Sequence, residues 1–297
     1  MQEDYDSFVV NNRQAVEEVF NLCRSNFFTN RIASTAKKPT NNSVEELAYK
    51  CVSLDFLVKF YEIVVKPFSP SMTVREVVEL IVKPATEKEM LSFIDIMCPG
   101  MFIRPTAFVS HAFGTPFHLL VDSLISHFRD ALPTEMFIWI DVFTFNQHNS
   151  GHDLHGGLTL KVAIDACQSV IVVLDRDALP LKRLWCLYEI GCTPPEKLIV
   201  LTQGFGKPHF EAVLSTIDAN EATCFDPNDT KGLRAKIRRI MVEQKAVTEQ
   251  ADETQALTAF SRILKLRLIS KSMMSYAEDL VEIKTSSPGN VLDWHAS

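Results

Sequence analysis

Short apolar runs alternate with helix-like segments through the middle of this chain, and this alternation limits the fold more than any other feature. Runs of this length are typical of strands that are buried on both faces. Strict strand–helix alternation favours a parallel sheet with right-handed crossovers. The sequence therefore predicts an α/β fold with a five-stranded parallel, flavodoxin-like sheet. The predicted strands are 106–110, 136–142, 169–174, 197–202 and a weaker 221–225, and the predicted helices are 117–131, 158–166, 184–192, 208–218 and 229–243.

The segments on either side of this pattern read as helical. Ser43 with Glu46 forms a capping-box pattern, and the apolar spacing that follows predicts a helix as far as Tyr61. Pro84 is expected to end the helix that precedes it. We therefore predict a helical N-terminal domain over 1–100, an α/β domain over 104–245 and a C-terminal helical extension over 246–297, with a loose tail from Ser286.

Composition excludes several classes of protein. The formal net charge of -7 argues against a nucleic-acid binder, which needs clustered positive charge. No run of about 18 apolar residues is present, so no membrane span is expected. Seven cysteines without a C-x-x-C pair indicate reduced thiols, and the acidic N-terminus does not look like a signal peptide. A cytoplasmic protein is the expectation.

Polar residues follow the predicted strands where ligands gather in an open parallel sheet. Ser110 and His111 follow the first strand, and Asn146 and His148 follow the second. Glu189 lies in the helix after the third strand. We expect these side chains to converge on one rim, as a functional crevice requires.

Three blocks resemble the signature segments of Toll/interleukin-1 receptor (TIR) domains. They are Phe108-Val-Ser110, Trp139-Ile-Asp141 and Trp185-Cys-Leu-Tyr-Glu189, in the family's order. The third block is similar to the Trp-Cys-Leu-x-Glu segment of plant TIR domains, and the wider phrasing resembles TIR-like proteins of algae and oomycetes. The resemblance covers about half of the chain.

The resemblance implies an activity, because many TIR domains cleave NAD+ at the nicotinamide–ribose bond. The family's catalytic glutamate corresponds here to Glu189. A carboxylate suits this reaction, since losing nicotinamide leaves an oxocarbenium-like positive charge on the ribose. NAD+ would be the substrate, with no separate cofactor and no metal. The resemblance also implies a homo-oligomer formed through the TIR-like domain. The residues expected to bind the substrate are Ser110, His111, Phe113, Asp141, Asn146 and Trp185, with Phe145 as a further stacking candidate.

A non-enzymatic scaffold that acts through TIR–TIR contacts is the leading alternative, since fold does not fix function. An enzyme is expected to place Glu189 on a cleft that also exposes an aromatic face. A scaffold is expected to bury Glu189, or to pair it with Lys182 or Arg183, and to expose an apolar patch.

Other chemistry is less well supported by the residues. His148, His152, Asp153 and His155 suggest a metal site for a hydrolase, but Gly151 interrupts any helix there, and a polar loop is favoured. Ser110, His111 and Asp141 resemble a hydrolytic triad without a G-x-S-x-G elbow. Cys186 is expected to pack in the core rather than to act as a nucleophile.

Overall fold

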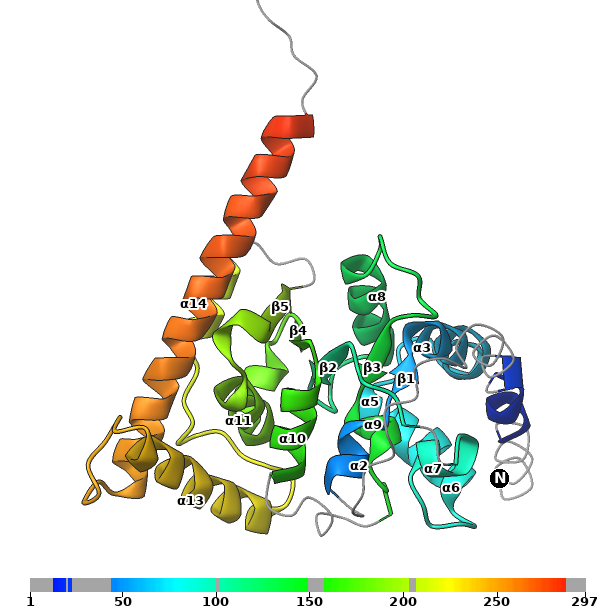
Figure 1. Cartoon of the computed structure of the whole chain (residues 1–297), viewed down its shortest axis with the longest axis horizontal. Coiled ribbons are helices and arrows are strands. Elements are labelled where there is room, and N and C mark those ends of the chain that lie inside the picture. Colours follow the sequence, from blue (N-terminus) through cyan, green and yellow to red (C-terminus); the bar gives the residue numbers. More distant parts are fainter. Residues whose placement is uncertain are drawn as a thin grey trace, which may run out of the picture.

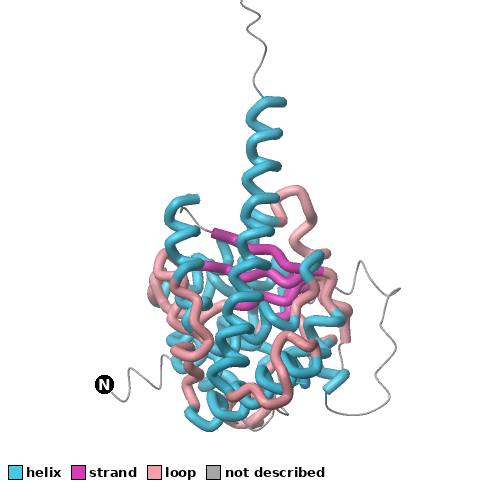
Figure 2. Tube along the Cα trace, turned by 90° about the vertical axis from the view of Figure 1, so that its left-hand side faces the viewer, coloured by secondary structure: helices cyan, strands magenta, loops and turns pink. Residues whose placement is uncertain are grey.

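The computed structural model describes residues 13–19, 21–22, 44–99, 102–148, 158–202 and 207–286. A five-stranded sheet lies at the centre, with helices against its two faces (Figures 1 and 2). The α/β prediction is thus confirmed. The last helix, α14 (Glu253–Ser286), runs along one side of the body, and its C-terminal half stands away from it (Figures 1 and 2).

Four of the predicted apolar runs form parallel strands. The strand order across the sheet is β1-β3-β2-β4-β5, and β2, β3, β4 and β5 are mutually parallel. Two predicted helices, α10 and α11, have the expected bounds. The bounds are β2 Ala107–Ser110, β3 Phe137–Trp139, β4 Ser169–Leu174, β5 Leu198–Thr202, α8 Phe117–His127, α9 Asp141–Thr144, α10 Leu158–Ala166, α11 Leu184–Cys192, α12 Lys207–Ser215 and α13 Pro227–Glu243, with 3-10 turns at Leu179–Lys182 and Pro195–Lys197.

The prediction of an all-parallel sheet is wrong in its fifth strand. That strand is β1 (Val52–Ser53), which pairs antiparallel with β3 at the opposite edge. The segment 221–225 contributes one isolated bridge, between Arg183 and Thr223. The backbone of Thr223 is paired with the start of α11, where its carbonyl accepts a hydrogen bond from Leu184 N, so it does not extend the sheet beyond β5.

The helix expected from Ser43 to Tyr61 is also interrupted, because β1 divides it. Helix α2 (Val44–Ala48) ends before β1, and α3 (Leu54–Phe60) begins directly after it. Ser53 explains the restart, since its side chain accepts a hydrogen bond from Phe56 N as the N-cap of α3. The strand pairing of Val52 with Ile138 outweighs the helical spacing of the apolar residues.

Pro84 does not end its helix. Helix α5 (Val74–Val77) passes through a π-helical turn (Val78–Val82) into α6 (Lys83–Thr86). A proline ring in a regular helix clashes with the carbonyl four residues earlier, and the wider turn before Lys83-Pro84 relieves such a clash. The same device precedes Lys66-Pro67, where a π-turn (Tyr61–Val65) joins α3 to α4 (Lys66–Phe68). A short helix, α7 (Phe93–Met97), completes this region.

Alternation along the strands assigns side chains to the two faces of the sheet. Val109 and Ile171 belong to the hydrophobic cluster that also contains α3, α5, α7 and α8. Phe108 packs with α2 and α10, and Val172 with α11, α13 and α14. Ser110 has the parity of Phe108, so it lies on the side of the sheet that carries α11.

None of the helices in the described part of the chain combines the length and the hydropathy that a membrane span needs.

Candidate functional site

Ser110 and Glu189 meet where β2 ends beside α11. The hydroxyl of Ser110 donates a hydrogen bond of 2.6 Å to Glu189 Oε2, and Ser110 is 1% exposed. In the described part of the chain, Glu189 forms no salt bridge with Lys182 or Arg183. The structure therefore does not support the interpretation in which Glu189 pairs with Lys182 or Arg183 at the surface.

Its surroundings raise the pKa of Glu189 to about 8. Burial is the largest cause, because it penalises the charged carboxylate, and the negative charge of Asp141 adds to it. The hydrogen bond from Ser110 and the nearby His111 act in the opposite direction. Glu189 is thus a carboxyl group that changes its charge near neutral pH.

His111 and Asp141 form a second polar pair beside Glu189. The distance from His111 Nε2 to Asp141 Oδ1 is 2.9 Å, and the His111 side chain is 1% exposed. Burial acts to lower the pKa of His111, but Asp141 and Glu189 oppose it and together raise the pKa above its ordinary value. The His111–Asp141 pair and the carboxyl group of Glu189 therefore interact electrostatically beside the same cavity.

A cavity of about 310 Å³ opens over these groups. Its lining includes six of the seven residues predicted for the site. The seventh, Ser110, is not in the lining but is hydrogen-bonded to Glu189, which is. One aromatic residue of the lining, Phe225, was not among the residues predicted from the sequence. The predicted residues in the lining are His111, Phe113, Asp141, Asn146, Trp185 and Glu189, joined by the stacking candidate Phe145.

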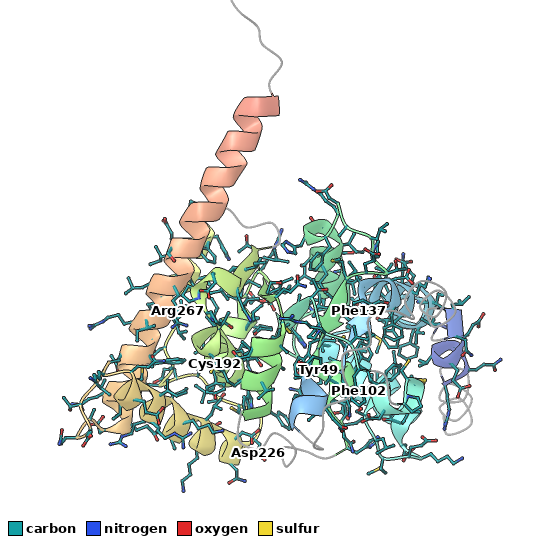
Figure 3. All side chains as sticks on the ribbon, viewed as in Figure 1. Tyr49, Phe102, Phe137, Cys192, Asp226 and Arg267 are labelled. Carbon is teal, nitrogen blue, oxygen red and sulfur yellow. The ribbon has the colours of Figure 1, made fainter. Side chains whose placement is uncertain are left out.

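Asn146 and Trp185 are held by contacts that the sequence did not indicate. Asn146 Nδ2 donates to Met90 O at 2.6 Å, and its Oδ1 accepts from His148 N at 3.0 Å. Trp185 Nε1 donates to Asp229 Oδ2 at 3.4 Å. Asn146 therefore anchors the loop after α9 to the N-terminal region, while the indole of Trp185 is oriented by the start of α13. Figure 3 labels Asp226, another lining residue, beside that start.

Several lining residues were missed by the sequence analysis. Arg75, Glu79 and Lys83 come from the helix over 74–86, where no catalytic pattern is visible. The capping box that Thr73 and Glu76 form marks only the start of this helix. These three residues reach the cavity because the N-terminal region packs on the sheet, and no local sequence motif predicts that packing.

The structure does not assemble the hydrolytic alternatives. Ser110 donates to Glu189, and within the described residues no hydrogen bond joins it to His111. Burial raises the pKa of the Cys186 thiol well above its ordinary value, and this thiol donates to His111 O at 3.2 Å. Such a thiol is a packed, unreactive group, as expected.

The metal interpretation finds no support where the structure can be described. No group of three metal-ligating side chains occurs among the described residues. His148 Nε2 lies 2.9 Å from Thr86 Oγ1. His152, Asp153 and His155 lie outside the described residues.

Comparisons with protein-family models, with curated proteins and with solved structures find no match to this chain.

Proposed function

We propose that this chain is a TIR-like NAD+ nucleosidase whose catalytic residue is Glu189. The observation that carries the proposal is the position of Glu189 on a cavity that also exposes the aromatic side chains of Phe113, Phe145 and Trp185. An enzyme is expected to have this arrangement, because Glu189 is only partly exposed but keeps that exposed part on the cavity.

The fold is in keeping with the proposal. Counted in chain order, the four parallel strands follow the order 2-1-3-4, which is the order of the first four strands of a flavodoxin-like sheet. Ligands of such sheets bind at the carboxyl ends of the strands, and Ser110, the last residue of β2, lies at such an end.

The reaction breaks the bond between the ribose C1′ and the nicotinamide nitrogen. The bonding electron pair leaves with nicotinamide, and water adds its oxygen to C1′ and releases a proton, giving ADP-ribose. The ionised carboxylate of Glu189 stabilises the positive charge that develops on the ribose. Nicotinamide is cationic while it is attached, so it needs no strong general acid.

Ser110 and the His111–Asp141 pair set the charge of Glu189. The Ser110 hydroxyl favours the carboxylate by donating to it, whereas Asp141 disfavours a second negative charge nearby. A bound cationic nicotinamide group also favours the ionised form. With a pKa of about 8, Glu189 is largely protonated at pH 7 in the free protein, and substrate binding helps to ionise it.

The test is to incubate the purified protein with NAD+ and to separate the products by chromatography. Wild type is expected to release nicotinamide, and Glu189→Ala is expected to lose this activity. Equal release by the two proteins would remove Glu189 from its role. No release by wild type, at any protein concentration, would favour the scaffold.

One observation favours the scaffold as a second candidate function. Helix α14 exposes Leu266 and Ile269, which are 62% and 41% exposed. Exposed apolar side chains one turn apart on a helix are typical of association surfaces. In that case the proposed homo-oligomer involves α14 as well as the TIR-like domain, and Leu266→Glu is expected to lower the mass measured by light scattering.

A further inference from the structure

The N-terminal region forms one wall of the cavity. The helix over 74–86 contributes Arg75, Val78, Glu79 and Lys83 to the lining, opposite the residues of α11. The hydrophobic cluster around β2 and β3 continues into α3 and α5, so this wall is packed onto the sheet. The site thus extends beyond the segment that resembles a TIR domain.

Arg75 is fixed to the loop that follows β2. Its backbone N donates to Phe113 O at 2.8 Å, and Val74 N donates to Thr115 O at 2.9 Å. The capping box of Thr73 and Glu76 fixes the same turn. Because the backbone on both sides of the contact is held, Arg75 has a defined place beside Phe113.

The guanidinium group of Arg75 lies between two aromatic rings. It is 4.7 Å from the ring centroid of Phe225 and 5.9 Å from that of Phe113. Phe225 is 78% exposed, so this cluster lies at the mouth of the cavity. Cation–π contacts orient the planar group but leave its N–H donors, which lie in the plane, for a ligand.

The charge of Arg75 is not neutralised within the described residues, where it forms no salt bridge. Lys83, on the same helix, pairs with Glu79 at 2.7 Å. A guanidinium group without a carboxylate partner is suited to bind phosphate in a bidentate manner. Arg75 is therefore the cation of this wall that remains for a ligand.

The acidic residues of the lining are engaged elsewhere. Asp141 faces His111, and Asp229 accepts a hydrogen bond from Trp185. Asp226 caps α13 through Asn228 N. Arg75 is the group that favours an anionic ligand at the mouth, whereas Glu189 and Asp141 favour a cationic or neutral group at the inner end.

The size of the cavity also indicates that one part of the ligand lies inside and another part lies at the mouth. Pockets for small molecules span about 300–1,000 Å³, so 310 Å³ lies at the small end. We take this as room for one half of a dinucleotide, with the rest of the ligand leaving through the mouth. The linking diphosphate would then pass Arg75.

We propose that Arg75 binds the diphosphate of the nucleotide and makes the site selective for diphosphate-bearing ligands over nucleosides. The choice of a dinucleotide ligand rests on the proposed function, whereas the cationic group at the mouth rests on the geometry of Arg75. In this account the N-terminal region is a specificity-determining part of the site.

Calorimetric titration of the full chain with ADP-ribose tests the contact without any turnover. The variants are Arg75→Gln, Arg75→Lys and Arg129→Gln, the last at an exposed arginine outside the cavity lining. We expect Arg75→Gln to weaken binding by about tenfold or more, because charge-assisted hydrogen bonds are lost. Arg75→Lys is expected to recover part of the affinity, and Arg129→Gln to bind as wild type does. Inorganic pyrophosphate is expected to displace ADP-ribose from wild type.

Equal affinity of wild type and Arg75→Gln for ADP-ribose would overturn the inference, as would a wild type that binds neither ADP-ribose nor pyrophosphate. A circular dichroism spectrum and a melting temperature like those of wild type show that the Arg75→Gln protein is folded. Arg75-dependent binding in a protein that releases no nicotinamide would support the inference while contradicting the proposed function. The two failures are therefore distinguishable.

Discussion

The hydroxyl of Ser110 and the carboxyl of Glu189 are joined by a hydrogen bond of 2.6 Å across the boundary between sheet and helix. This bond favours the ionised carboxylate, whereas burial and Asp141 favour the neutral acid. The balance determines the pH at which Glu189 acquires the charge that the proposed reaction uses.

Ser110→Ala is expected to raise the pH at which the enzyme becomes active. In wild type, kcat/KM for NAD+ should rise with pH through the pKa of Glu189, at about 8, because this ratio reports the free enzyme. Without the hydroxyl, the midpoint should move upward by roughly half to one pH unit. Ser123→Ala removes a buried hydroxyl on α8, bonded to Leu119 O, and serves as the control. A midpoint that stays in place in Ser110→Ala would argue against this role of the hydrogen bond.

Glu189→Gln is expected to stabilise the protein in alkaline solution. The pKa of Glu189 is about 8 in the folded chain and near 4.5 in an unfolded one, so the folded state holds the proton more tightly. The wild-type free energy of unfolding therefore falls as pH rises from about 4.5 to about 8. Gln stays neutral, and its advantage should grow to roughly 2–4 kcal/mol at pH 9.

Urea unfolding at pH 5 and pH 9 measures this advantage. The exposed Glu196 provides a matched control, since Glu196→Gln removes a surface carboxylate and should leave the free energy of unfolding close to that of wild type. A Glu189→Gln protein that is less stable than wild type at pH 9 would show that the carboxylate is a stabilising group.

Asp141→Asn is expected to lower the pKa of His111. Burial acts to lower this pKa, and the Asp141 carboxylate is the main group that opposes burial. Proton–carbon correlation spectra of the histidine Cε1 groups, recorded as a function of pH, measure the change. The Cε1 signal of His209, which pairs with Arg176 O on the surface, identifies a histidine outside the site and serves as the reference. An unchanged or raised pKa of His111 would contradict the pairing seen in the structure.

A side chain at Gly191 is expected to destabilise the protein. A Cβ atom there would lie 2.4 Å from Cε2 of Phe260, where α11 packs against α14. We expect Gly191→Ala to lower the free energy of unfolding by about 1–3 kcal/mol through overpacking. Phe260→Leu should cost less in the Gly191→Ala background than in wild type.

Gly232→Ala is the matched control for this substitution. Gly232 lies inside α13 with no atom within 4 Å of an added Cβ. Alanine there should stabilise the protein by about 0.5–1 kcal/mol. Chemical denaturation of the variants gives the comparison, and an equal effect of alanine at Gly191 and Gly232 would contradict the close packing of α11 on α14.

Local sequence patterns predicted the strands and helices whose own residue composition favours one structure. Continuous apolar runs such as 169–174 have one stable place, a strand covered on both faces, and β4 has these bounds. Leu184–Cys192 likewise forms the predicted helix α11. Because the strands are parallel, Ser110 and Glu189 were expected near one rim, and they are in contact.

Long-range packing explains what local patterns did not predict. Val52 and Ser53 lie within a segment whose apolar residues have helical spacing, yet they form β1 because β3 offers an open edge. Pro84 is a helix breaker by its chemistry, but a π-turn accommodates it. Arg75 enters the cavity only through this packing, since its position depends on backbone bonds to a loop some forty residues later in the chain.

The most direct test of the central claim is kcat/KM for NAD+ hydrolysis, measured as nicotinamide release at pH 8.5 for wild type, Glu189→Gln and Glu196→Gln. The account predicts activity in wild type and in Glu196→Gln, and a loss of about 100-fold or more in Glu189→Gln, as when one group that stabilises transition-state charge is removed. Nicotinamide release by Glu189→Gln at the wild-type rate would contradict it.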